Sequence, residues 1–137
     1  MKLTGDEISL INSLNNLSAV QAKDCLITDN VICFLVDKKD VGRAVGKSGN
    51  NIRELGSKTK KRIEIMEFHP NIGLFVKSSL PKIKVRDVST EEVDGKKIVF
   101  VSLDSENRRK ILGSMGRLKR IKELAKRNYK VDDIRIK

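Results

Sequence analysis

The sequence predicts an α+β fold in which one small unit, ordered α-β-β-α-α-β, occurs twice. In both halves of the chain, apolar residues follow helix-like and then strand-like spacing in this same order. Asp37, Gly46 and Gly49 also have counterparts of the same residue type 67 positions later (Asp104, Gly113 and Gly116). Residues 1–68 and 69–137 are therefore predicted to be two domains. Because each is near the lower size limit for an independent core, we expect them to pack together as one rigid unit.

A helix is expected at the start of the first copy. The segment from Thr4 to Glu7 has the pattern of a capping box, in which both side chains bond to backbone N–H groups. Ile8, Ile11 and Leu14 follow at helical spacing and are predicted to form the buried face of this helix.

Two short apolar runs, residues 25–27 and 31–36, predict a β-hairpin that turns at the Asp-Asn pair between them. A two-residue loop would place Cys25 and Cys33 on opposite faces of the hairpin, whereas a loop one residue longer would bring them face to face. Buried reduced thiols are favoured over a disulfide.

Residues 37–55 predict two helices joined by a turn. Asp37 begins an acidic helix start, and apolar residues recur at helical spacing on both sides of the segment Gly46-Lys47-Ser48-Gly49 (Val41, Ala44 and Val45; Ile52 and Leu55). Alternating apolar residues in 62–66 predict the strand that closes the first copy.

The second copy is predicted to open with a helix at residues 71–80, with Leu74, Phe75 and Ser78 on one face and Pro81 as its end. Two strands joined by a type I′ turn should follow (residues 82–86, Asp94-Gly95 and residues 98–103). Asp104 is predicted to cap a helix at residues 105–112. A glycine-bounded turn at 113–116, a second helix at 117–127 and a closing strand at 134–136 should follow.

The tripeptide Gly46-Lys47-Ser48 resembles the end of a nucleotide-binding P-loop, but the surrounding sequence does not fit that motif. The position that requires the first P-loop glycine holds Val41, and a helix rather than a buried strand is expected before the tripeptide. Two glycines that bracket two polar residues at the start of a helix are suited to hold an anion. An ordinary turn between two helices is the alternative.

The net charge of +11 is concentrated in the second copy. Residues 1–68 contain 11 Lys and Arg against 9 Asp and Glu, whereas residues 69–137 contain 18 against 9. Residues 108–127 alone contain nine basic residues and one acid. This local excess predicts a polyanionic partner, and a lysine-rich surface kept for solubility or heat tolerance is the alternative.

Several functional classes are disfavoured by composition. The N-terminus has acidic residues where a signal peptide would be apolar, which predicts a cytoplasmic protein without a membrane span. One histidine, His69, and two cysteines are too few for a metal or catalytic cluster, so neither a metal nor a cofactor is expected. Phe34 and Phe100 lie in apolar runs and are expected in the core, which leaves few aromatic residues for stacking RNA bases.

Four segments carry a resemblance to a known family: LTGDEISLI, VGRAVGKSGNNIREL, LGSMGRLKRIKELAKR and VDDIRIK. Together they resemble tandem type II KH domains, most closely those of the short archaeal NusA-like transcription factors. The resemblance implies two domains, each a three-stranded mixed sheet with helices on one face. It also implies a monomeric protein, not an enzyme, that binds single-stranded RNA in transcription termination or antitermination. RNA polymerase is a further candidate partner.

In that family RNA crosses the GxxG loop, and about four bases occupy an apolar groove beside it. The resemblance therefore implies RNA contacts at both glycine segments and their neighbours (Arg43, Gly46, Lys47, Ser48, Gly49, Asn50 and Arg53; Gly113, Ser114, Met115, Gly116, Arg117, Lys119 and Arg120). Ile52 would face bases as well as the core. The second segment departs from the pattern because neither middle residue is basic. Nearby arginines and lysines could supply the charge there, or the second copy could be a scaffold.

Two other functions fit parts of the sequence. A KH-containing ribosomal or RNA-processing component would use the basic second copy to bind structured RNA. A nucleotide hydrolase would use Gly46-Lys47-Ser48, although the missing glycine at Val41 argues against it.

Overall fold

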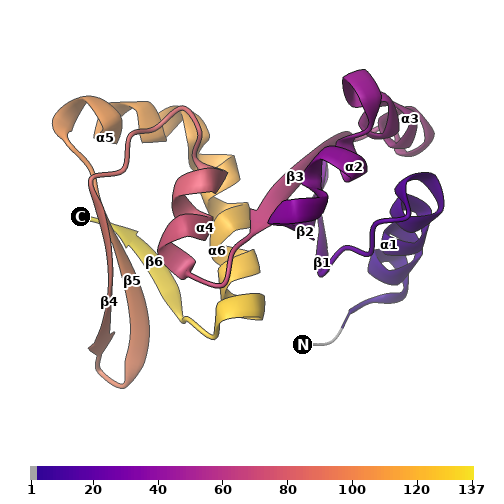
Figure 1. Ribbon diagram of the computed structural model, residues 1–137. Coiled ribbons are helices and arrows are strands. Elements are labelled where there is room, and N and C mark those ends of the chain that lie inside the picture. Colours follow the sequence, from indigo (N-terminus) through magenta and orange to yellow (C-terminus); the bar gives the residue numbers. More distant parts are fainter. Residues whose placement is uncertain (1–2) are drawn as a thin grey trace. The chain divides into compact units, whose positions relative to one another are not determined.

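The computed structural model describes residues 3–137, and the chain divides into two compact units, Met1–His69 and Pro70–Lys137 (Figure 1). The helices and strands of the first unit follow the predicted order: α1 (Gly5–Ser18), β1 (Asp24–Ile27), β2 (Val31–Asp37), α2 (Val41–Val45), α3 (Asn50–Thr59) and β3 (Arg62–Phe68). Short 3₁₀ turns precede α2 and join α2 to α3 (Lys38–Asp40 and Lys47–Gly49).

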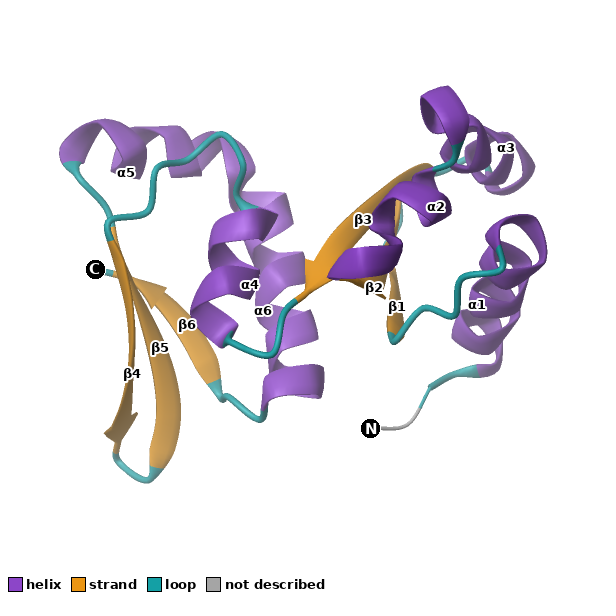
Figure 2. Cartoon of the chain, viewed as in Figure 1, coloured by secondary structure: helices purple, strands orange, loops and turns teal. Residues whose placement is uncertain are grey.

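The first unit has a three-stranded mixed sheet with β2 in the centre. Strand β2 is antiparallel to β1 and parallel to β3. All three helices and one face of the sheet contribute to a single buried cluster (Ile11, Leu14, Ala44 and Leu55 from the helices; Cys25, Ile32, Phe34, Val36 and Ile63 from the strands). The helices therefore cover one face of this sheet, as Figure 2 shows.

The capping box at the start of α1 is confirmed. The Glu7 backbone N–H donates to Thr4 Oγ1 at 3.1 Å, and the Thr4 N–H donates to Glu7 Oε1 at 2.9 Å. The predicted buried face is wrong at Ile8, which is 47% exposed. The buried positions are 7, 11, 14 and 18, a stripe that leaves Ile8 on its edge.

The register of the first hairpin decides whether Cys25 and Cys33 face each other. Ile27 pairs with Ile32, Leu26 with Cys33 and Cys25 with Phe34, as expected for a two-residue loop. The two thiols therefore lie on opposite faces of the hairpin, where both are buried and not joined in a disulfide. The prediction of reduced cysteines is confirmed.

The second unit repeats the order of elements: α4 (Ile72–Ser79), β4 (Asp87–Val93), β5 (Lys96–Ser102), α5 (Ser105–Ile111), α6 (Met115–Tyr129) and β6 (Asp133–Ile136). Its sheet has β5 in the centre, antiparallel to β4 and parallel to β6. The core includes Phe75, whose ring stacks on that of Tyr129 with centroids 4.9 Å apart.

The predicted strand at residues 82–86 is wrong, because the partner of β5 is β4 at Asp87–Val93. Asp94 and Gly95 both have positive φ, which confirms the type I′ turn. This two-residue turn sets the register, so that β5 ends where Ser102 pairs with Asp87. Residues 82–86 lie beyond the last paired position, although their apolar residues alternate as in a strand.

Three further expectations in the second unit need correction. Leu74 is exposed, and the buried face of α4 consists of Phe75, Val76 and Ser79 instead. Phe100 is only partly buried: it pairs with Ser89 and Arg135 in the sheet, and Lys137 Nζ lies 5.8 Å from the centroid of its ring. Helix α6 starts at residue 115 rather than 117 and continues to residue 129.

Candidate nucleic-acid interface

The segment Gly46–Gly49, which we call the first loop, has an unusual backbone. Gly46, Ser48 and Gly49 have φ values of 82°, 54° and 75°. Ser48 is the only one of the three with a Cβ, and a left-handed conformation costs such a residue about 1–2 kcal/mol. This conformation must therefore be held in place by its surroundings.

Backbone hydrogen bonds provide part of this support. The Gly46 N–H donates to the Gly42 carbonyl and ends α2, and the Gly49 N–H donates to the Gly46 carbonyl, both at 3.1 Å. Helix α3 then begins at residue 50. The loop thus turns the chain sharply from the end of one helix into the start of the next.

Gly46 is required by space as well as by φ, whereas Gly49 is required mainly by its φ. A Cβ added to Gly46 would lie 2.8 Å from Asn51 Cγ and 3.0 Å from the Asn51 backbone nitrogen. A Cβ added to Gly49 would lie 3.2 Å from Arg53 Nη1. The contact with Asn51 Cγ is shorter than real Cβ contacts, so a side chain at residue 46 would force Asn51 to shift.

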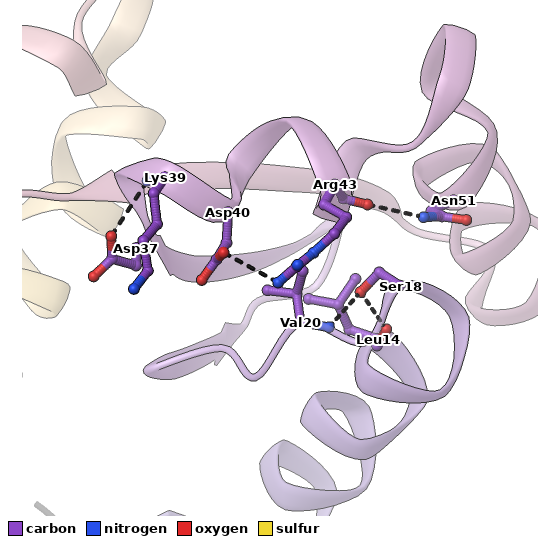
Figure 3. A network of polar contacts seen from close by, with 8 residues as sticks. All are labelled: Leu14, Ser18, Val20, Asp37, Lys39, Asp40, Arg43 and Asn51. Atoms are coloured by element: carbon purple, nitrogen blue, oxygen red, sulfur yellow. Dashed lines mark hydrogen bonds and ion pairs between the residues drawn. The ribbon is translucent and has the colours of Figure 1, made fainter.

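Two side chains brace the loop from α3. Asn51 Nδ2 donates to the backbone carbonyl of Arg43 at 3.2 Å, across the loop (Figure 3). The Arg53 guanidinium donates to the backbone carbonyl of Ser48. Sequence reasoning missed Asn51, because nothing in the chain distinguishes it from the adjacent Asn50.

The tip of the first loop is open to solvent. The side chains of Lys47 and Ser48 are exposed, and within residues 3–137 Lys47 Nζ forms no hydrogen bond or ion pair. Arg43 forms an ion pair with Asp40 at 3.1 Å, also drawn in Figure 3. The positive end of the α3 dipole lies directly behind this tip. The arrangement can accept an anion through Lys47 and the helix start.

The first loop is not a P-loop, because Gly46-Lys47-Ser48 follows helix α2 rather than a strand. The structure brings together all the candidate residues of the first copy (Arg43, Gly46, Lys47, Ser48, Gly49, Asn50 and Arg53) on the ends of α2 and α3 and the loop between them. Ile52 is partly buried and packs against the core of the unit.

The corresponding segment Gly113–Gly116, which we call the second segment, has a different backbone. None of its four residues has a positive φ. Leu112–Ser114 form a 3₁₀ turn, and Met115 and Gly116 already belong to α6. A Cβ added to Gly113 would meet no atom within 4 Å. The chain therefore passes from α5 into α6 by helical turns, without the left-handed bend of the first loop.

The side chains around the second segment also differ. Leu112 and Met115 are 71% and 44% exposed at this corner. Arg117, predicted to contact RNA, donates a hydrogen bond from Nε to the Ser79 carbonyl and so ties α6 to the end of α4. Lys119 is exposed on α6, whereas Arg120 is partly buried.

A depression of about 550 Å³ lies on the second unit, where residues 81–84 meet the start of α5. Lysine and acidic side chains line it together (Lys82, Lys84, Lys110, Asp104 and Glu106). Asp104 caps α5, and hydrogen bonds from the Asn107 backbone and side chain hold the pKa of this carboxyl below its usual value. The mixture of charges makes this depression a poorer site for an anion than the first loop.

Other kinds of site are not apparent in the part of the chain that the structure describes. Residues 3–137 contain no group of three His, Cys, Asp or Glu side chains that could hold a metal ion. None of the helices described is both long enough and apolar enough to span a bilayer.

Comparison of the chain with known proteins identifies its family. A model of the KH domain matches residues 10–103. Relatives named "Probable transcription termination protein NusA" occur in archaea. The protein of Methanocaldococcus jannaschii is 28% identical over 99% of this chain and 75% of its own length. Those of Methanococcus vannielii and Halococcus morrhuae are each 27% identical, over 99% and 94% of this chain and 79% and 91% of their own lengths.

Among solved structures, the crystal structure of APE1850 superposes with a TM-score of 0.87 at 25% identity. The match covers 98% of this chain and all of that one. The resemblance to the archaeal NusA-like proteins is thereby confirmed over nearly the whole chain. The chain belongs to the KH domain family, and within that family to the archaeal NusA-like proteins.

Proposed function

We propose that this chain is an RNA-binding protein of transcription termination or antitermination that holds single-stranded RNA on its first loop. Membership of the KH domain family and the archaeal relatives named as termination proteins support this role. The observation that carries it is the first loop itself, an exposed turn with three left-handed residues at the start of a helix. We propose a binding protein rather than an enzyme, without a cofactor.

In this proposal the RNA backbone crosses Gly46–Gly49, where the absence of two Cβ atoms allows a phosphate to approach the main chain. Lys47 supplies a positive charge at the tip, and the start of α3 adds its helix dipole. Arg43, Asn50 and Arg53 flank the path of the RNA. Ile52, which is partly buried beside the loop, contacts a base.

We propose that residues 70–137 form a second KH domain. The shared order of elements and the matching sheet topology of the two units support this assignment. The cationic side chains of Arg117, Lys119 and Arg120 contribute more to RNA binding than the backbone does, because none of Gly113, Ser114, Met115 and Gly116 has the positive φ found in the first loop. The second segment then contacts RNA less closely than the first loop does.

We also propose an assembly state and a second partner. The protein acts as a cytoplasmic monomer, its two domains form one rigid unit, and RNA polymerase is a second partner. Sedimentation tests whether the protein is a monomer. Equal rotational correlation times of the two units, measured by NMR relaxation, would indicate that the two domains form one rigid unit. Binding to purified archaeal RNA polymerase tests whether the polymerase is a partner.

The distribution of charge favours one alternative, a ribosomal or RNA-processing component that docks on structured RNA. Its basis is the excess of 18 basic over 9 acidic residues in 69–137, together with the helical backbone of the second segment. In this case the second unit would provide most of the affinity. Co-sedimentation with ribosomal subunits would support it.

The two functions differ in the RNA that they select. Affinities should be measured for short single-stranded RNAs, duplex RNA and DNA across a series of salt concentrations. Our proposal requires a preference for single strands, because the groove of a KH domain accepts unstacked bases. If roughly three to six phosphates are neutralised, the log–log salt slope should be about −2 to −4. Equal affinity for duplex RNA would favour the alternative, and a slope near zero would exclude an electrostatic role for the loop.

A further inference from the structure

The first loop and the second segment share their glycine spacing but not their backbone, so another residue must decide the conformation. Arg53 does not distinguish them. Its counterpart 67 positions later is also an arginine, Arg120, whose Nη1 lies 3.5 Å from a Cβ added to Gly116. The same arginine-over-glycine arrangement therefore occurs with a left-handed loop in one unit and with helical turns in the other.

Asn51 does distinguish them. The residue 67 positions later is Leu118, which is 3% exposed in the core of the second unit and has no polar atom to donate. The carbonyl that Asn51 bonds belongs to Arg43, in the last turn of α2, where helix carbonyls lack partners within the helix. A side-chain donor from α3 satisfies this carbonyl and holds the two helix ends together across the loop.

Gly46 makes this hydrogen bond possible. The Asn51 amide occupies the space that a Cβ at residue 46 would need, and no atom occupies the equivalent space at Gly113. Gly46 is thus needed for the bracing side chain as much as for its own φ of 82°.

We infer that Asn51 is a positioning residue for RNA binding, which keeps the first loop in its left-handed conformation before RNA arrives. This inference rests on the proposed function of the loop. The Asn51 side-chain amide acts by donating its hydrogen bond, which fixes the end of α2 against the start of α3. Lys47 and Ser48 are thereby held at the tip of the loop. Without this donor the loop would sample other conformations. It would then bind RNA less tightly, because part of the binding free energy would be needed to order the loop.

The experiment compares the variants N51A and N51D with wild type and with N50D. Aspartate has the size of asparagine but cannot donate to the Arg43 carbonyl when ionised. N50D adds the same charge one residue away without removing the hydrogen bond, so comparing N51D with N50D in the absence of RNA isolates the effect of the donor on the loop. S57A, on an exposed position of α3, controls for substitution in this helix. Thermal unfolding of each variant shows whether the fold is retained.

We expect N51A to weaken binding of a short single-stranded RNA about 5- to 20-fold with an unchanged salt slope, because no phosphate contact is lost. K47A should instead make the slope less negative by about 0.7, the value for one phosphate on a single strand. N51D should also bind more weakly than wild type, and S57A should bind like wild type.

Hydrogen exchange without RNA provides the second readout. The Gly49 N–H, bonded to the Gly46 carbonyl in the wild type, should exchange faster in N51A and N51D but not in N50D. Weaker RNA binding with unchanged Gly49 exchange would mean that Asn51 merely touches RNA, and would overturn the inference. Unchanged affinity in a folded N51A would also overturn it. If the wild type itself fails to bind single-stranded RNA, the proposed function fails, and the exchange data alone still decide whether Asn51 orders the loop.

Discussion

The guanidinium of Arg53 donates a hydrogen bond to the backbone carbonyl of Ser48, the only non-glycine residue of the first loop with a left-handed conformation. One side chain thus supports the most strained peptide of the loop and brings a positive charge beside it. The two effects can be separated, because lysine would retain the charge but lacks the planar fork that reaches the carbonyl.

We predict that R53K weakens binding of single-stranded RNA by about 1.5–3 kcal/mol, the range for a hydrogen bond that involves a charged group. Its salt slope should remain that of wild type. R53A should lose a similar amount and in addition have a slope less negative by about 0.7. Fluorescence anisotropy at several salt concentrations measures both quantities. Binding of R53K at wild-type affinity would show that Arg53 contributes only its charge.

Two carboxylates at the tip of the first loop should repel RNA. The double variant K47D/S48D retains both glycines and should remain folded by circular dichroism. We expect it to lose about 2–4 kcal/mol of binding free energy, from like-charge repulsion and the lost lysine.

The matched variant S114D/M115D places the same charges on the second segment. It should lose clearly less, because the helical backbone there presents no comparable loop. Equal losses in the two variants would show that both segments hold RNA. A folded K47D/S48D that binds like wild type would mean that the first loop is only a turn.

The paired glycines should respond in opposite ways to alanine. G46A introduces a Cβ that collides with Asn51 at a backbone φ of 82°, and we expect it to destabilise the protein by about 1–3 kcal/mol. G113A meets open space in a helical turn and should stabilise by about 0.5–1 kcal/mol. Chemical denaturation measures both. A stabilising G46A or a destabilising G113A would contradict the conformations described for these loops.

The cap of α5 should make the second unit sensitive to acid. The folded pKa of Asp104 is held below its ordinary value, about 3.9, mainly by hydrogen bonds from Asn107. A depressed folded pKa means that the carboxylate stabilises the fold above the unfolded value and that this stabilisation is lost as pH falls through the folded value.

D104A should therefore unfold at a lower temperature than wild type at pH 7, and the difference should narrow as the pH is lowered from about 4 to 2. E106A, an exposed change two residues after the cap, serves as the control. A difference between wild type and D104A that stays constant over this range would show that the carboxylate charge has no part in the cap.

The features that the sequence predicted correctly depend on chemistry within a few residues. The capping box of Thr4 and Glu7, the cap at Asp104 and the type I′ turn at Asp94-Gly95 each involve groups close together in the chain. The order of helices and strands follows from the spacing of apolar residues for the same reason. The KH assignment was also accessible, because its segments surround these local signals.

Tertiary structure decided the features that depend on partners far along the chain. Residues 82–86 alternate like a strand, but they precede Asp87, where the pairing of β4 with β5 ends in the register that the turn sets. Ile8 and Leu74 look like core residues, yet they are exposed because the neighbouring elements cover other faces of their helices.

The residues of the candidate site likewise include some that the sequence identified and one that only the structure revealed. Its glycines were identified from their spacing, since a GxxG turn between helices is a local pattern, and Lys47 and the flanking arginines were identified from the resemblance to KH domains. Asn51 was not, because its importance arises from a carbonyl eight residues earlier that the fold brings within 3.2 Å. The helical backbone of the second segment was equally hidden. There the residue at the equivalent position, Leu118, is buried in the core, and packing rather than glycine content determines how the chain turns.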